Sequence, residues 1–205
     1  MREGDTVNIT NGSGLLLKGR IRHLDPKACE VDPDEVTQAK AKNFSLHLAV
    51  SPVKNMARFE WFLEKSTEIG IDQITPLICK RSEKVHVRND RLQKILVSSM
   101  KQSLNLFLPR LNEPLNFPDL IRDAKADSKY IAWCETSNEP LLSHVCPPGK
   151  DVIVLIGPEG DFNSEEVALA IKTGFLPISL GKNRLRTETA ALAACFAVNF
   201  VNKTI

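Results

Sequence analysis

The stretch LIGPEGDFNSEEV, residues 155–167, joins an apolar segment to a helical one through two glycines, a proline and two acids. The preceding run DVIVLI (151–156) has no polar alternation, which is typical of a strand covered on both faces of a parallel sheet. Asn163 followed by Glu166 matches a helix-capping box. A loop at the carboxyl end of a parallel strand often holds a ligand. On this stretch alone, a plain strand-to-helix turn is the preferred interpretation.

Composition narrows the class of protein. The 205 residues suggest one large domain, or one domain with a small appendage. A net charge of +2 does not suit a protein that coats nucleic acid by bulk charge, so any such contact needs a local patch. No apolar run suggests a membrane span, and no signal peptide is expected at the N-terminus. The five cysteines and four histidines show no zinc spacing, so we expect no metal, no disulfide and a reducing cytoplasm.

From residue 44 onward, strand and helix patterns alternate. We expect strands at 44–50, 73–79, 129–134, 151–156 and 176–180, and helices at 55–70, 91–106, 163–172 and 187–201. This alternation predicts an α/β fold with a mostly parallel sheet and helices on both sides.

Residues 1–43 have a different pattern. Short β-like runs flank Asn11-Gly12-Ser13-Gly14, which is a hairpin signal, and the polar stretch DPDEVTQAKAKN (32–43) is expected to be a linker. Because two or three strands do not make a stable unit alone, this segment looks like part of a β-barrel.

The common phosphate-loop fingerprints and the nucleophile elbow are absent from the sequence. Glycines instead follow two neighbouring strands, at Gly157–Gly160 and at Gly181, and LGKNRLRTETA (180–190) runs into the last helix. These glycines allow a ligand to approach the backbone closely, so backbone groups could read an adenine edge. Thr187 is expected to cap the last helix, whose N–H groups could bind a carboxylate or phosphate. An ordinary capped helix start is the alternative.

Four stretches together resemble one family: 64–77 (EKSTEIGIDQITPL), 99–111 (SMKQSLNLFLPRL), 155–167 (LIGPEGDFNSEEV) and 179–194 (SLGKNRLRTETAALAA). They are similar to the RsmE family, SPOUT-class methyltransferases that modify N3 of a uridine in 16S ribosomal RNA of the small subunit. The resemblance implies a SPOUT-type sheet with a C-terminal deep trefoil knot at 44–205, preceded by a partial PUA-like β-barrel at 1–43. It also implies S-adenosyl-L-methionine as cofactor, a homodimer with the active site near the interface, and a substrate within the assembled 30S subunit. The apolar last helix supports a dimer, with Ala190, Ala194 and Cys195 small enough for close helix packing.

Two departures from the family pattern stand out. Asp161 replaces a second glycine after Pro-Glu-Gly, and aspartate tolerates unusual backbone angles better than most residues. The N-terminal segment matches only the latter part of the family's barrel, so we expect upstream strands to be missing and RNA methylation to be weaker than cofactor binding.

The resemblance and the loop pattern together predict site residues. Arg186 is the candidate cation that stabilises the uridine anion, with a structural ion pair to Glu188 or Glu159 as the alternative. Glu159 could act as a base, although positioning the loop is the preferred role. The predicted cofactor contacts are Leu77, Ile156, Gly157, Pro158, Glu159, Gly160, Leu180, Gly181, Asn183, Leu185, Arg186 and Thr187. The predicted RNA contacts are Lys54, Arg58, Lys80, Arg81, Lys84, Arg88, Lys182 and Arg184.

A non-catalytic RNA-binding protein that keeps this scaffold, and a related enzyme that acts on tRNA, are the alternative functions. The intact glycine loops disfavour the first.

Overall fold

The computed structural model describes residues 1–25, 27–133 and 139–204. Its centre is a seven-stranded sheet in the order β10-β8-β9-β4-β5-β6, with β7 also pairing with β5, and the pairings in it are parallel. The expected α/β class is therefore confirmed. The strands are β4 (Leu46–Val50), β5 (Gln73–Ile78), β6 (Arg110–Leu111), β7 (Leu115–Asn116), β8 (Ser128–Ala132), β9 (Val152–Ile156) and β10 (Leu176–Ile178).

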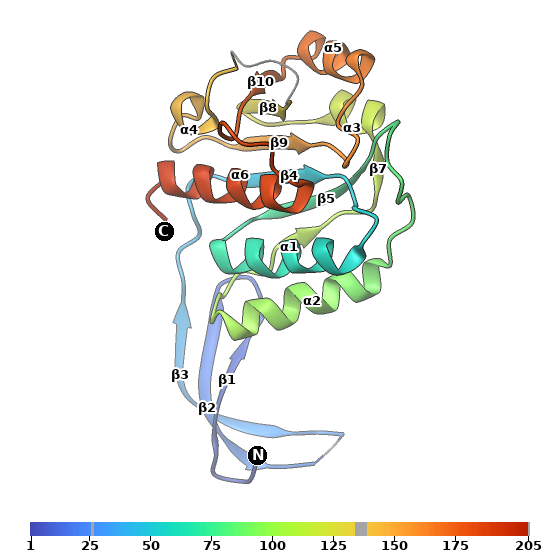
Figure 1. Cartoon of the computed structure of the whole chain (residues 1–205). Coiled ribbons are helices and arrows are strands. Elements are labelled where there is room, and N and C mark those ends of the chain that lie inside the picture. The colour runs from blue at the N-terminus through green and yellow to red at the C-terminus, as the bar shows by residue number, and fades with distance from the viewer. Residues whose placement is uncertain (26, 134–138, 205) are drawn as a thin grey trace.

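Helices cover both faces of this sheet (Figure 1). One face carries α1 (Met56–Ile69), α2 (Asn89–Gln102), α4 (Leu142–Val145) and α6 (Thr187–Val201), and the other carries α3 (Phe117–Asp123) and α5 (Ser164–Lys172). Strand β9 shows why its sequence lacks polar alternation. Val152, Val154 and Ile156 pack in the core under α1 and α6, whereas Ile153 and Leu155 pack in the core under α3 and α5.

Local signals placed several helix ends. Asn55 caps α1 through its side chain, and Gly70 ends that helix in the left-handed conformation, at φ 102°. The capping box of Asn163 and Glu166 is present at the start of α5. Helix α2 ends at Gln102, earlier than predicted, and the chain turns through Leu104 at φ 56°.

Two expectations about helices need correction, and two short helices were not predicted. Thr187 does not cap α6, because it is the first helical residue and the N-cap is Arg186, whose side chain makes no capping hydrogen bond. Ala194 and Cys195 are fully buried in the chain's own core, so they do not form a surface for a second copy. The sequence pattern also missed the short α3 and α4, since neither spans enough residues to show a helical period.

The N-terminal residues form a separate three-stranded antiparallel sheet, which extends from the body as an arm (Figure 1). The predicted hairpin joins β1 (Thr6–Thr10) to β2 (Leu15–His23), and β3 (Glu30–Gln38) pairs along β2. Most of the predicted linker is therefore strand. The linker was predicted because this stretch is polar and shows no apolar alternation. Both faces of the arm are largely exposed, so a strand there does not require such alternation.

The hairpin tip docks the arm on the body. The N–H of Gly14 donates to the carbonyl of Leu106 at 2.9 Å, and the N–H of Leu108 donates to the carbonyl of Gly12 at 2.9 Å. Both glycines have positive φ, 70° at Gly12 and 92° at Gly14. A methyl group built on Gly14 would lie 2.7 Å from the Phe107 ring, so only glycine fits this contact.

A second anchor lies at the end of the arm. The ammonium of Lys42 donates to the carbonyl of Gly70 at 2.6 Å and to the carboxylate of Asp72 at 2.7 Å. Within the described ranges, no helix combines the length and apolar character needed to cross a bilayer.

Candidate functional site

The carboxyl ends of β4, β5 and β9 meet at one edge of the sheet. The N–H of Ser51, just after β4, donates to the carbonyl of Ile156 at 3.0 Å. The hydroxyls of Ser51 and Ser82 lie 2.8 Å apart, and the Ser82 hydroxyl also accepts the N–H of Cys79 at 2.9 Å. Two small hydroxyl side chains therefore tie the three strand ends together.

The loop after β9 is tightly packed at its first residue. A methyl group built on Gly157 would lie 3.1 Å from the ring of Phe162, which is fully buried and packs against Phe117 at a centroid distance of 5.5 Å. Glycine is favoured at position 157 because the loop folds back over this ring, and not because of its own φ, which is outside the left-handed region.

Asp161 occupies the left-handed conformation at φ 61°, which aspartate tolerates better than most residues. Such a backbone costs an ordinary residue roughly 1–2 kcal/mol. Two hydrogen bonds support it: the N–H of Asp161 donates to the carbonyl of Pro158 at 2.9 Å, and its carboxylate accepts the N–H of Phe162 at 2.8 Å. The aspartate therefore replaces a glycine without losing the turn.

The loop after β10 lies beside the loop after β9. The hydroxyl of Thr187 donates to the carbonyl of Gly157 at 3.0 Å, which joins the start of α6 to the end of β9. Gly181 has φ 139°, and no atom lies within 4 Å of a methyl group built on it, so space is open at this position. The structure thus brings together the two glycine-containing strand ends that the sequence singled out.

Arg186 remains without an ion pair in the part of the chain that the structure describes. Glu188, its first alternative partner, is nearly buried and lies 3.9 Å from the guanidinium of Arg58 instead. Glu159, the second, accepts the backbone N–H of Lys54 at 3.3 Å. Arg186, Lys182 and Arg184 are exposed and lie close to Gly181 in the sequence.

The predicted RNA contacts differ in their surroundings. Lys54 pairs with Glu83 at 3.3 Å, Lys80 with Glu165 at 3.0 Å, and Arg88 with Asp90 at 3.3 Å. Exposed ion pairs of this kind contribute little to stability and exchange partners readily, so these side chains can still reach a phosphate. Arg81 is different, because its guanidinium donates to the backbone carbonyls of Gly160 at 2.9 Å and Phe162 at 3.4 Å.

The predicted cofactor contacts differ in exposure. Ile156, Pro158 and Thr187 are buried, Leu180 and Leu185 are half-buried, and Glu159, Gly160, Asn183 and Arg186 are exposed. Leu77 is fully buried in the core under α3 and α5, on β5, and β4 separates it from β9.

Sequence reasoning missed the second role of Glu166. One carboxylate oxygen accepts the N–H of Asn163 at 2.9 Å, as the capping box predicts, and the other accepts the N–H of Lys80 at 2.8 Å. The capping pattern could identify the first contact, but nothing local in the sequence signals the second. Burial, together with the nearby Glu166 carboxylate, raises the pKa of the Cys79 thiol far above its usual range, so this cysteine is an inert core residue.

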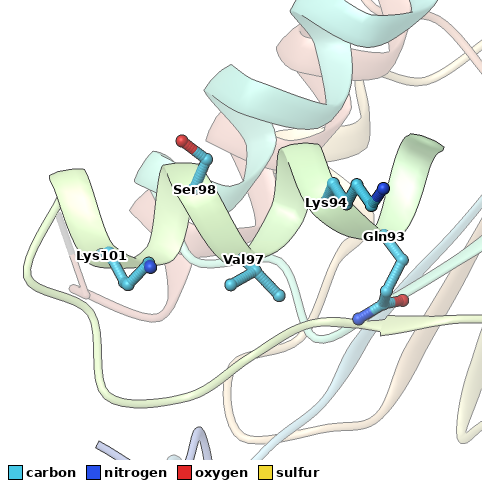
Figure 2. Close-up of a pocket in the computed structure, with 5 residues that line it drawn as sticks. All are labelled: Gln93, Lys94, Val97, Ser98 and Lys101. Carbon is cyan, nitrogen blue, oxygen red and sulfur yellow. The ribbon is translucent and has the colours of Figure 1, made fainter. Parts of the chain in front are cut away.

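A shallow depression lies elsewhere, on the outer face of α2 (Figure 2). It is lined by Gln93, Lys94, Val97, Ser98 and Lys101. Because one helix supplies the whole lining, the depression has no opposing wall to fix a ligand, and we do not treat it as a site.

Comparisons with known proteins agree with this geometry. The model of the RNA methyltransferase domain family matches residues 40–199. A ribosomal RNA small subunit methyltransferase E of Mesomycoplasma hyopneumoniae (strain 232) is 34% identical over 152 residues, which cover 72% of this chain and 65% of that protein. The match therefore spans slightly less than two thirds of the relative's length.

Two solved structures are similar over nearly the whole chain. A probable rRNA-methyltransferase from Porphyromonas gingivalis is 35% identical with a TM-score of 0.92, covering 100% of this chain and 87% of that one. A putative methyltransferase from Legionella pneumophila, solved in complex with the bound cofactor SAM, is 30% identical with a TM-score of 0.87, covering 98% and 85%. The match to the family model extends over most of the parallel sheet and both loops at its edge, and this chain belongs to the RNA methyltransferase domain family.

Proposed function

We propose that this chain transfers a methyl group from S-adenosylmethionine to N3 of a uridine in small-subunit ribosomal RNA. The observation that carries the proposal is the hydrogen bond from Thr187 to the carbonyl of Gly157, which holds two glycine-containing strand ends together close to Arg186, a cation without an ion pair among the described residues. The relative from Mesomycoplasma hyopneumoniae is named as a small-subunit enzyme, and the similar protein from Legionella pneumophila holds SAM.

The cofactor would lie between residues 156–160 and 180–187. Backbone groups of both loops are available to an adenine edge, and the open space beside Gly181 gives room for a ring. The first turn of α6 lacks a side-chain cap, so its N–H groups can donate to a carboxylate. When bound, S-adenosylmethionine supplies a methyl group on a sulfonium, which the deprotonated N3 displaces from sulfur.

Two side chains have distinct roles in this proposal. Uridine N3 is a poor nucleophile until it loses its proton, and a cation near O2 or O4 stabilises the resulting anion. Arg186 suits this role because it is exposed at the N-cap of α6 and has no ion pair within the described residues. Glu159 positions the loop, since its carboxylate accepts the N–H of Lys54 at 3.3 Å.

RNA binding would use the basic side chains around this edge of the sheet. Because N3 lies on the base-pairing edge, the target base must be unpaired or flipped out. The contacts we propose are Lys54, Arg58, Lys80, Lys84, Arg88, Lys182 and Arg184.

We also propose that the chain contains the trefoil knot and the partial PUA-like barrel of the family, and specific contacts support both. Pro140 and Leu142 exchange backbone hydrogen bonds with Ser179, so the chain that leads into α6 runs against an earlier segment, as a trefoil knot at 44–205 requires. The three-stranded arm at 1–43 is consistent with part of a PUA-like barrel. We place the protein in the cytoplasm, on 30S subunits.

A homodimer is supported by the outer face of α6. Phe196 and Phe200 are 52% and 61% exposed and stack at a centroid distance of 6.0 Å. Two large exposed aromatic rings on a helix that adjoins the cofactor loops favour coverage by a second copy, which would place the active site near the interface.

Calorimetric titration with S-adenosylhomocysteine tests the cofactor site. We expect saturable binding that Gly181→Trp abolishes by filling the open space. Gly181→Ala is the matched control, because it shares the backbone strain of φ 139° without the bulk. Equal affinity of Gly181→Trp and the unmodified chain would place the cofactor elsewhere.

Methyl transfer from labelled cofactor tests the reaction. We expect label in small ribosomal subunits that lack this modification, and none in transfer RNA. Arg186→Ala should lower kcat about 100-fold or more while the chain still binds S-adenosylhomocysteine. Label in transfer RNA alone would refute the proposed substrate.

A further inference from the structure

We propose that Arg81 is a positioning residue for cofactor binding, which it achieves by holding the backbone of the loop after β9, and that it is not an RNA contact. The cofactor part of this inference rests on the proposed function. The positioning part rests on the contacts of Arg81 alone.

The guanidinium of Arg81 bridges two carbonyls of one turn. Nη1 donates to the oxygen of Gly160 at 2.9 Å and to the oxygen of Phe162 at 3.4 Å. Between these two acceptors lies Asp161, whose backbone is left-handed at φ 61°. A guanidinium that donates to the carbonyls on either side of a strained residue favours the turn over its extended alternatives, because only the turn brings both oxygens to one nitrogen.

The side-chain stem of Arg81 contributes as well. A methyl group built on Gly160 would lie 3.4 Å from the Cβ of Arg81 and 3.6 Å from its Cδ. The stem therefore covers the outer side of Gly160, and the charged end reaches past it to the two carbonyls. This fits the ordinary behaviour of arginine, which packs its methylene groups while the guanidinium donates at the end.

The neighbours of Arg81 hold the same loop. The N–H of Lys80 donates to Glu166 at 2.8 Å, and Glu166 in turn accepts the N–H of Asn163 at 2.9 Å. On the other side, the Ser82 hydroxyl lies 2.8 Å from that of Ser51. Lys80, through Glu166, and Arg81 thus fix the segment 160–163 from outside. Ser82 ties the end of β5 to the end of β4, and Thr187 fixes Gly157 from inside at 3.0 Å.

This arrangement separates Arg81 from the other basic residues of its segment. Lys80 and Arg88 pair with exposed carboxylates, and Lys84 has no ion pair among the described residues, so all three can turn toward a phosphate. Arg81 would have to release two backbone carbonyls to do so. The geometry therefore assigns it to the loop that the cofactor would contact.

The first measurement needs no ligand. Amide hydrogen exchange of the peptide 157–163 should be at least about fivefold faster in Arg81→Ala than in the unmodified chain, because the turn opens more often. Arg81→Lys should be intermediate, since an ammonium can also donate to these carbonyls but its side chain is shorter than that of arginine. Arg122→Ala is the matched control: it removes an exposed guanidinium that pairs with Asp119 and Asp123 on or beside its own helix.

The second measurement is the affinity for S-adenosylhomocysteine. We expect Arg81→Ala to weaken binding roughly tenfold, Arg81→Lys to recover part of the loss, and Arg122→Ala to leave binding unchanged. RNA affinity should keep its salt dependence in Arg81→Ala, whereas loss of a phosphate contact would lower the salt slope by about one.

Unchanged exchange of peptide 157–163 in Arg81→Ala overturns the positioning role. Faster exchange together with cofactor affinity within twofold of the unmodified chain overturns the link to the cofactor. A lower salt slope for RNA in Arg81→Ala overturns the claim that Arg81 is not an RNA contact. If the unmodified chain binds no S-adenosylhomocysteine, the proposed function fails, and the exchange result still decides whether Arg81 positions the loop.

Discussion

Replacing Gly157 by alanine should destabilise the protein through one contact. A methyl group at this position lies 3.1 Å from two carbons of the Phe162 ring and 3.3 Å from the Phe162 backbone nitrogen. The ring cannot retreat easily, because Phe162 is fully buried and packs against Phe117 at 5.5 Å. Forcing one extra methyl group into such packing costs about 1–3 kcal/mol.

The net loss is smaller than this cost. Alanine restricts the unfolded chain more than glycine does, which stabilises the folded state by roughly 0.4–1 kcal/mol where the backbone is compatible. Gly157 avoids the left-handed region, so this gain applies. From the middle of each range, we therefore expect a net loss of about 1.3 kcal/mol. For a chain of this size, that lowers Tm by about 3–5 °C.

Thermal and urea unfolding of the purified chain measure the effect. Gly160→Ala is the matched control in the same loop, since its methyl group would meet Arg81 at 3.4 Å, an ordinary contact. We expect Gly160→Ala to be neutral or slightly stabilising. If Gly157→Ala is as stable as Gly160→Ala, the Phe162 ring does not restrict this position and the reasoning fails.

Three further perturbations have defined outcomes. Burial, with a smaller effect of Arg110, lowers the pKa of His47 from 6.5 to about 4. Between these two pH values, the unfolded chain binds a proton at this histidine and the folded chain does not. The free energy of unfolding should therefore fall by up to about 3 kcal/mol as pH drops from about 6.5 to 4. Urea melts across this range should show that loss, and His47→Gln should remove it. Gly14→Ala, at φ 92°, forces a methyl group to within 2.7 Å of the Phe107 ring and should release the hairpin tip from the body. Limited proteolysis should then cleave the arm faster than in the control Gly4→Ala, whose methyl group would have no atom within 4 Å. Phe200→Glu places a charge on the exposed aromatic face of α6, and light scattering should then find a 22.8 kDa monomer where the unmodified chain is a dimer; an unmodified chain that is already monomeric contradicts the proposed dimer.

The sequence was sufficient for several structural features that depend on neighbouring residues. The unbroken apolar run at 152–156 identified a strand with two covered faces. The pair Asn163 and Glu166 placed the start of α5, and Gly70 placed the end of α1. The glycines at the ends of β9 and β10 located the edge of the sheet where the candidate site lies, because backbone geometry at a tight turn restricts residue type locally.

The polar arm shows where local patterns fail. Asp32 to Gln38 reads as a linker, yet it forms strand β3 because β2 supplies a partner for its backbone groups. Backbone pairing needs no apolar side chains when both faces are exposed, so hydrophobic periodicity carries no signal there. Ala194 and Cys195 present the opposite case. Their helix is apolar on most sides, so its sequence does not assign them to the core or to the surface.

Only the tertiary structure decided which charged side chains bind partners within the chain. Arg81 and Lys84 are both basic residues of one segment, but the first holds two carbonyls about eighty positions away and the second does not. Glu188 pairs with Arg58, which leaves Arg186 without an ion pair in the described part of the chain, although Arg186 is the nearer cation in sequence. Sequence determines which side chains can donate or accept, but the path of the chain between residues 80 and 160 determines which of them meet, and that path is a property of the whole packed sheet.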